Sequence, residues 1–248
     1  MAQLITTIII ELIIISPIIG IALNRPDRRW KYLSLFSLYY LGYSCLLFTP
    51  MLYPALSFID SDWNWSGKLY AFGGSILFYI LFRKLFAEHN FITFKQRNTS
   101  IKISLFITII IFMAAVGAAM LSINSSATRS AYFLFQFTMP GLDEEIAYRG
   151  IMLGLLSNAL PSRVYFKNKS LGNPALLITS ILFGLVHSFQ IDQGWCFHQN
   201  WFEFISTFAT GLLLGWLTIK SGSILMSILI HDLINTLPGL ITLTINQF

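Results

Sequence analysis

Four ionisable side chains lie close together inside an apolar stretch of the chain, in the segment PGLDEEIAYRG. Each such group costs about 2.5 to 3.5 kcal/mol in hydrocarbon, so it is normally paired, turned inward or used for chemistry. Glu145 and Arg149 are four residues apart with the acid first, the favourable order for a helical ion pair. Glu144 projects about 100° away from Glu145 on a helix of 3.6 residues per turn. The spacing predicts a structural pair that leaves Glu144 free to act; the alternative is a salt-bridge cluster, including Asp143, that only locks helix packing.

Two further polar pairs lie on later apolar runs. Phe183 and His187, in FGLVH, are one helical turn apart, and His231 and Asn235, in HDLIN, share one helix face. Both histidines and the asparagine fall at a depth similar to that of Glu144, so we expect these groups to converge. A carboxylate and one imidazole can take a proton from water, and the other imidazole with the amide NH₂ can stabilise a tetrahedral oxyanion. The set predicts hydrolysis by activated water.

The same residues could instead hold a metal ion. Catalytic zinc sites usually present three protein ligands and an open position, which Glu144, His187 and His231 could supply. The motif HExxH is absent from the sequence. The amide of Asn235 is better suited to donating a hydrogen bond to an oxyanion than to binding zinc. We expect no metal and no cofactor, and zinc is the alternative that the sequence leaves open.

Membrane-spanning helices must position these residues. Of the 248 residues, 55% are hydrophobic and 11% are charged, whereas about a quarter are charged in a soluble domain. Pro140 followed by Gly141 predicts a break in the longest apolar run, just before the acidic cluster. We expect an all-α polytopic membrane protein, a bundle of about eight helices around an intramembrane polar cavity. Runs of the roughly 20 residues that a span needs are found at residues 4–23, 33–53, 69–86, 103–123, 131–160, 174–190, 201–219 and 222–245.

The basic residues predict the orientation, because Lys and Arg accumulate in cytoplasmic loops. Only Lys68 and Arg129 fall in the loops that follow even-numbered runs. We therefore expect both termini to be non-cytoplasmic and, in a bacterium, the chain to lie in the inner membrane. No basic stripe with interleaved aromatic residues is evident, so nucleic acid is not an expected partner. The basic residues after odd-numbered runs are Arg25, Arg28, Arg29, Lys31, Arg83, Lys84, Lys95, Arg97, Lys102, Arg163, Lys167, Lys169 and Lys220.

Two other acidic residues in apolar runs are expected to be structural. Glu11 has no basic neighbour in sequence, so we expect it to be protonated or bonded to a neighbouring helix. Asp232 projects away from His231, so we expect it to contact a neighbouring helix or Arg149 rather than to act in catalysis.

The ordered set of three motifs resembles that of the CAAX protease and bacteriocin-processing (CPBP, or Abi) family, whose eukaryotic members are the Ras-converting CAAX endopeptidases. The resemblance covers about residues 131–245 and implies an eight-helix intramembrane bundle around a membrane-embedded cavity. We accordingly expect residues 131–248 to form a catalytic four-helix region, and residues 1–130 a four-span region to which the motifs assign no role. The matching motifs are Glu144-Glu145-x-x-x-Arg149, Phe183-x-x-x-His187 and His231-x-x-x-Asn235.

The resemblance also implies a role for each motif residue. Glu144 and His187 would activate water, His231 and Asn235 would form the oxyanion hole, and the acid–arginine pair of the first motif would be structural. The implied activity is an intramembrane endopeptidase acting on a membrane-associated or lipidated protein or peptide. Family members have been described as glutamyl-type and as metal-dependent proteases, so zinc stays open. The alternative function is a non-catalytic membrane regulator or bacteriocin-immunity protein on the same bundle.

Overall fold

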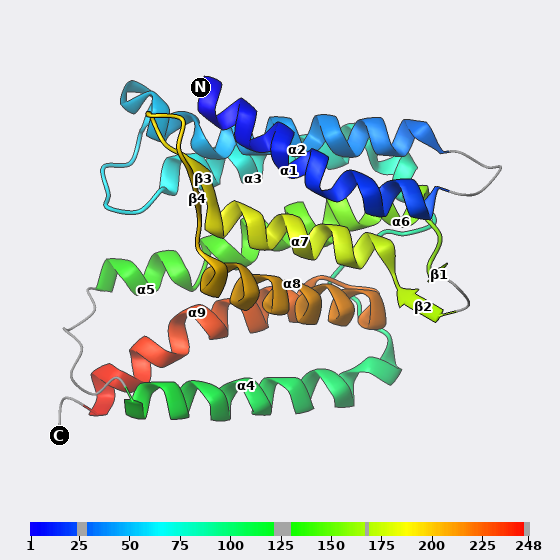
Figure 1. The fold of residues 1–248 in the computed structure, drawn as a ribbon. Coiled ribbons are helices and arrows are strands. Elements are labelled where there is room, and N and C mark those ends of the chain that lie inside the picture. The colour runs from blue at the N-terminus through cyan, green and yellow to red at the C-terminus, as the bar shows by residue number, and fades with distance from the viewer. Residues whose placement is uncertain (24–28, 122–129, 167–168, 246–248) are drawn as a thin grey trace.

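The structure, a computed structural model, describes residues 1–23, 29–121, 130–166 and 169–245, and these are mostly helical (Figure 1). Short 3₁₀ turns occur at Pro54–Leu56, Arg83–Phe86 and Asn98–Ser100. The longer helices are α1 (Ala2–Ala22), α2 (Trp30–Leu52), α3 (Trp65–Phe82), α4 (Ile101–Leu121), α5 (Ser130–Gln136), the π-helix η4 (Pro140–Met152), α6 (Leu153–Ala159), α7 (Pro174–Ser188), α8 (Trp201–Ser221) and α9 (Leu225–Ile245).

Each predicted apolar run contains helix, but helix length supports fewer spans than expected. Among the described residues, four helices are long and apolar enough to cross a membrane: Ala2–Ala22, Trp30–Leu52, Trp65–Phe86 and Trp201–Ser221. Helix α7 has only 15 residues, fewer than the roughly 20 that a straight span needs. The protein is therefore an integral membrane protein, and the predicted count of about eight spans is not confirmed by helix length.

The fifth predicted run is broken where the sequence indicated. Helix α5 ends at Gln136, and η4 begins at Pro140, whose fixed φ and missing N–H suit the first turn of a helix. The period of 3.6 residues per turn assumed for the acidic cluster was wrong, because residues 140–152 form a π-helix with i→i+5 hydrogen bonds. The π-helix is rare, and its usual single-turn form is frequent at functional sites.

Two short antiparallel ribbons depart from the all-α expectation. Strand β1 (Val164–Phe166) pairs with β2 (Lys169–Gly172), and β3 (Phe189–Ile191) pairs with β4 (Phe197–Gln199). The second ribbon is closed by Asp192, which accepts a hydrogen bond from the backbone N–H of Cys196 and contacts His198 at 2.9 Å. The hydrogen bond with His198 lowers the pKa of the Asp192 carboxyl. These contacts stabilise the turn of a ribbon that begins directly after α7.

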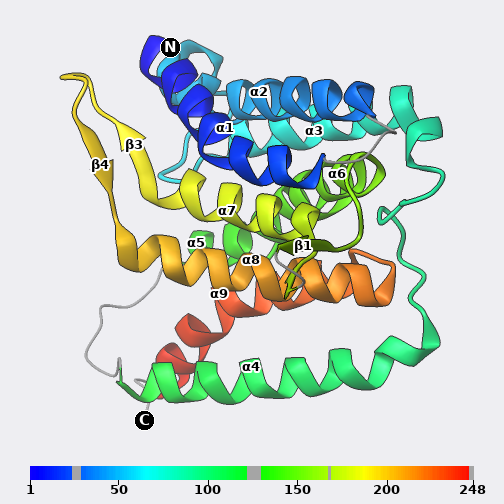
Figure 2. The ribbon, with the colours of Figure 1, turned by 45° about the vertical axis from the view of Figure 1, so that its right-hand side comes forward.

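The helices pack around η4. Helix α2 packs on α3, α7 on α8, and α4 along α9, while η4 contacts α2, α3, α7, α8 and α9. Figure 2 shows α4 at one edge of the molecule, beneath α9. In Figure 1 the start of α1 and the end of α9 lie toward the same end of the bundle. The acidic cluster of η4 is thus surrounded by helices from both halves of the chain.

The outer helix faces are apolar, as a lipid-facing surface requires. Exposed side chains of this kind include Ile9 and Ile13 on α1 and Leu77, Ile80 and Leu81 on α3. Large exposed apolar surfaces are rare on monomeric soluble proteins and mark membrane or protein contacts. The polar side chain of Glu11, in contrast, is buried, and its carboxylate accepts a hydrogen bond of 2.7 Å from the hydroxyl of Tyr40 on α2.

Part of the predicted orientation cannot be placed on the structure. Arg25, Arg28, Arg129 and Lys167 lie outside the described residues.

Candidate active site

A hydrogen bond to another helix fixes the start of η4. The backbone N–H of Gly141 donates to Asp232 Oδ1 on α9 at 3.0 Å, so Asp232 binds a neighbouring helix, which was one of the two partners expected for it. A Cβ atom at residue 141 would lie 2.3 Å from the same oxygen, so only glycine allows this approach. An acidic side chain at a helix N-terminus also complements the helix dipole. The contact sets the position from which the acidic cluster projects.

Glu145 binds two partners with the same oxygen. Arg149 Nη1 donates to Glu145 Oε1 at 2.9 Å, and His231 Nδ1 lies 2.7 Å from that oxygen. Glu145 and Arg149 are almost completely buried, with 0% and 2% of their surfaces exposed. Since the oxygen already accepts from the guanidinium, His231 donates through its Nδ1–H. The predicted partners are therefore in contact, and sequence spacing missed the imidazole that shares their carboxylate.

His187 is oriented by its own helix. Its Nδ1 lies 2.7 Å from the carbonyl oxygen of Phe183, which can only accept, so Nδ1 carries the proton and Nε2 is the acceptor in the neutral imidazole. The ring of Phe183 packs against three of the neighbouring groups: its centroid lies 4.1 Å from Arg149 Cζ, 4.6 Å from the His187 ring and 5.9 Å from the His231 ring. Phe183 thereby fixes both imidazoles.

Glu144 faces both imidazoles with one oxygen. Its Oε2 lies 3.8 Å from His187 Nε2 and 3.8 Å from His231 Nε2. These separations exceed the usual hydrogen-bond range, and this oxygen has no hydrogen-bond partner within the described ranges. The other oxygen, Oε1, accepts from the ammonium group of Lys68. The expectation that Glu144 is left free was therefore wrong for one of its two oxygens.

From the sequence we predicted that Lys68 lies in a non-cytoplasmic loop, and this prediction of its position was wrong. It is the fourth residue of α3, only 8% of its surface is exposed, and its Nζ also lies 3.2 Å from Asp143 Oδ2. The hydroxyl of Tyr43 on α2 donates to the same Asp143 oxygen at 2.9 Å. A single lysine at the start of an apolar run reads as an interfacial residue, so the sequence carried no signal for this contact.

The four predicted site residues line one cavity of about 360 Å³: Glu144, His187, His231 and Asn235. Lys68 lines it too, and α8 closes one side with Glu203, Ser206, Thr207 and Thr210. The cavity therefore combines a carboxylate, two imidazoles, an amide and an ammonium group. Such a set can move a proton and bind developing negative charge.

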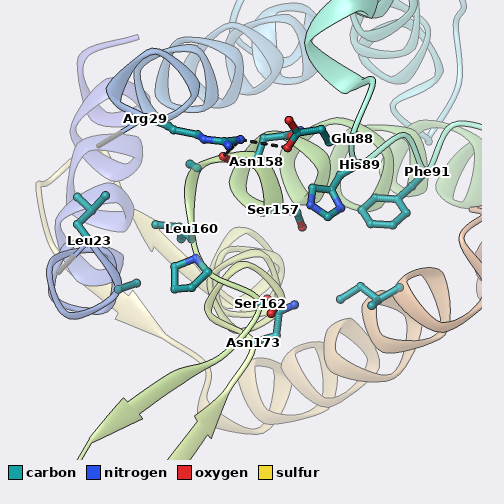
Figure 3. Close-up of a pocket in the computed structure, with 14 residues that line it drawn as sticks. Leu23, Arg29, Glu88, His89, Phe91, Ser157, Asn158, Leu160, Ser162 and Asn173 are labelled. Carbon is teal, nitrogen blue, oxygen red and sulfur yellow. Dashed lines mark hydrogen bonds and ion pairs between the residues drawn. The ribbon is translucent and has the colours of Figure 1, made fainter. Parts of the chain in front are cut away.

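A second cavity, of about 410 Å³, lies elsewhere, beside the ends of α1 and α6 (Figure 3). Arg29 lies across it and donates to Glu88 Oε2 at 3.1 Å and to the carbonyl oxygen of Asn158 at 3.2 Å. The side chains of Arg29 and Glu88 are 42% and 64% exposed, so this ion pair contributes little to stability. None of the predicted site residues lines this cavity.

The comparisons with known proteins agree with the motif pattern. Residues 126–237 match the family model described as Type II CAAX prenyl endopeptidase Rce1-like. No curated protein and no solved structure matches the chain. The matched segment contains η4, α7, α8 and the first part of α9, and therefore all of the predicted site residues. Lys68 and Tyr43 lie outside it.

Proposed function

We propose that the chain is an intramembrane endopeptidase of the CAAX protease family, because residues 126–237 match the Rce1-like family model. Its substrate is a membrane-associated or lipidated protein or peptide, and one peptide bond of that substrate is hydrolysed. The observation that carries the proposal is the pair of 3.8 Å separations between Glu144 Oε2 and the two imidazole Nε2 atoms. A water molecule about 2.8 Å from Glu144 Oε2 and from one imidazole fits between them.

Glu144 and His187 activate this water. The Glu144 carboxylate accepts one proton from the water as its oxygen attacks the carbonyl carbon of the scissile bond, and the lone pair of His187 Nε2 orients the water by accepting a hydrogen bond from its other O–H. The tetrahedral intermediate then collapses, the C–N bond breaks, and the same proton passes to the leaving amine. The substrate gains one OH on the acyl side and one H on the amine side, which is the balance of hydrolysis.

His231 and Asn235 stabilise the oxyanion of that intermediate. Asn235 donates from its amide NH₂. His231 already donates from Nδ1 to Glu145, so it can donate from Nε2 as well only in its doubly protonated form. The Glu145 carboxylate orients the imidazole, because it accepts a hydrogen bond from Nδ1 at 2.7 Å. Glu145 thus supports the oxyanion hole through His231.

The reaction proceeds without a metal ion. Within the described ranges, no group of three or more His, Cys, Asp or Glu side chains is arranged to hold one. Glu144 is already bound by the Lys68 ammonium, which would repel a divalent cation on the same carboxylate. The Lys68 contact therefore supports a metal-free mechanism, and no step above uses zinc.

We also propose that the bundle crosses the membrane eight times, with both termini on the non-cytoplasmic side. Helix is present in each of the eight predicted runs, and α1 begins at the same end of the bundle at which α9 ends (Figure 1). The lipid bilayer is then a partner along the whole outer face. Helices shorter than a straight span are accommodated by the ribbons that follow them and by local thinning of the bilayer.

The activity is tested with purified protein in proteoliposomes and an internally quenched, farnesylated CAAX peptide. Glu144→Ala and His187→Ala should each lower turnover by roughly 10²- to 10⁴-fold. The double variant should add little, because the two residues act on one proton transfer. Glu88→Ala and His89→Ala change the same residue types outside the cavity and should keep full turnover. Turnover should also survive exhaustive chelation; metal-dependent loss and recovery would contradict the metal-free mechanism.

Full activity in both Glu144→Ala and His187→Ala would contradict catalysis at this site. No turnover by the wild type would favour the non-catalytic regulator or immunity protein. The natural substrate is identified by comparing membrane proteomes of cells that carry the wild type with those that carry Glu144→Ala. A protein that accumulates uncleaved only in the variant is the substrate.

A further inference from the structure

Lys68 lies in the candidate active site although it comes from α3, outside the matched residues 126–237. We propose that Lys68 is a positioning residue: its ammonium group holds Glu144 Oε1 so that Oε2 faces the two imidazoles. The inference rests on the proposed function, because it assigns a role in the reaction of Glu144. It also gives the first half of the chain a part in that reaction.

The contacts of Lys68 define one orientation of the carboxylate. Its Nζ binds Glu144 Oε1 and lies 3.2 Å from Asp143 Oδ2, so two neighbouring residues of η4 hold the same ammonium group. Asp143 is itself held by the Tyr43 hydroxyl at 2.9 Å. An ammonium group with these two acceptors cannot follow a rotation of Glu144 without losing Asp143. Glu144 Oε2 is thereby kept on the side of His187 and His231.

Contacts at the start of α3 fix the position of the backbone next to Lys68. Asn64 caps the helix by accepting from the N–H of Gly67 at 3.0 Å, and its amide donates to the carbonyl oxygen of Leu47 on α2 at 2.8 Å. A Cβ atom at Gly67 would lie 2.1 Å from that carbonyl oxygen, so α3 meets α2 with no space for a side chain. This contact fixes the residue that precedes Lys68.

Charge neutralisation alone does not explain the arrangement. Glu144 also faces two imidazoles, and in the absence of Lys68 either oxygen could turn toward them. A buried lysine must be paired, but pairing with Asp143 alone would satisfy that requirement. The additional contact with Glu144 Oε1 selects which oxygen meets the water. Because catalysis depends on the geometry of the reacting groups, this selection affects the rate.

The test is the kinetics of Lys68→Met on the farnesylated peptide in proteoliposomes. We expect kcat to fall about 100-fold, the loss that a displacement of about 1 Å causes. KM should change little, because the group lost acts through Glu144 and not on substrate binding. Lys68→Arg keeps the charge and the donors and should recover most of kcat. Lys84→Met removes an exposed lysine outside the cavity and should leave both constants unchanged.

The double variant Lys68→Met with Asp143→Asn distinguishes the proposed positioning role of Lys68 from a purely structural role. This variant removes one positive and one negative charge, so its melting temperature in detergent should recover relative to Lys68→Met. Its kcat should stay low, because Glu144 Oε1 still has no anchor. Recovery of kcat together with the melting temperature would overturn the inference.

The experiments distinguish a failure of the inference on Lys68 from a failure of the proposed function. If Glu144→Ala is inactive but Lys68→Met turns over like the wild type, the inference on Lys68 is wrong and the proposed function stands. If Glu144→Ala cleaves the peptide as well as the wild type does, the proposed function is wrong, and the inference falls with it.

Discussion

At the scale of single residues, Glu145 links stability to catalysis. One of its oxygens accepts from Arg149 at 2.9 Å and from His231 Nδ1 at 2.7 Å. The spacing of four residues indicated the first contact, because both partners lie in one segment. It could not indicate the second, because 86 residues separate Glu145 from His231 and only the packing of α9 against η4 joins them.

Arg149→Leu should lower the free energy of unfolding by about 3 to 5 kcal/mol, because it leaves the buried Glu145 carboxylate without its guanidinium partner. The double variant Glu145→Leu with Arg149→Leu should be more stable than Arg149→Leu. Its turnover should nevertheless stay low, because His231 loses the acceptor at Nδ1. Denaturation in detergent and peptide cleavage measure the two effects separately.

The exposed pair of Arg29 and Glu88 is the matched control for this prediction. Glu88→Leu should change stability by at most about 1 kcal/mol, since solvent screens both groups. An Arg149→Leu protein that is as stable as the wild type but inactive would indicate that Arg149 contacts the substrate instead.

The site residues were predictable to different degrees for physical reasons. Glu144, His187, His231 and Asn235 could be selected because polar groups are costly in apolar runs and therefore stand out. Lys68 stood out less, because a lysine one turn from a helix start can extend its ammonium group to the interface. Whether it does so depends on Asp143 and Glu144, which follow it by more than 70 residues.

At the scale of elements, the junction between η4 and α9 determines where the acidic cluster points. The sequence indicated the break at Pro140 and Gly141, because proline and glycine interrupt helices by their own backbone chemistry. It did not indicate the π-helix, which is rare and has the same apolar run around it as an α-helical span would have. The ribbons were missed for a similar reason: strands of three or four residues leave too short a pattern.

Gly141→Ala should destabilise the protein by about 1 to 3 kcal/mol, because the new Cβ must displace Asp232 Oδ1. The displacement also breaks the hydrogen bond from the Gly141 N–H, so turnover should fall as η4 shifts. Gly42→Ala on α2 is the control: nothing lies within 4 Å of its new Cβ, and its melting temperature should not fall. Equal melting temperatures for the two variants would contradict this account of the junction.

At the scale of the whole molecule, the two halves of the chain share the site. Three of the four described helices that are long and apolar enough to span a membrane lie in the first half of the chain. Hydropathy alone was therefore enough to predict these three helices from the sequence. What hydropathy could not show is that α2 and α3 contribute Tyr43 and Lys68 to the cluster on η4. Side-chain contacts between halves leave no mark on composition.

Both termini should be non-cytoplasmic. Lys68 no longer counts as a loop residue, which strengthens the bias of the remaining basic residues toward the other side. Alkaline phosphatase fused to either end should be active, and green fluorescent protein at the same ends should be dark. The reverse pattern at both ends would place the termini in the cytoplasm, and opposite patterns at the two ends would contradict an even number of spans.

The pairing of Lys68 with Glu144 has a consequence for biogenesis, because 76 residues separate the two. At a synthesis rate of about 5 to 20 residues per second, Lys68 precedes its carboxylate by roughly 4 to 15 seconds. During that interval α3 carries an unpaired cation, which its position near the helix start lets it hold at the membrane surface. The ammonium group gains its two carboxylate partners only when η4 arrives. Nascent chains that stop before η4 therefore present a lysine without these partners.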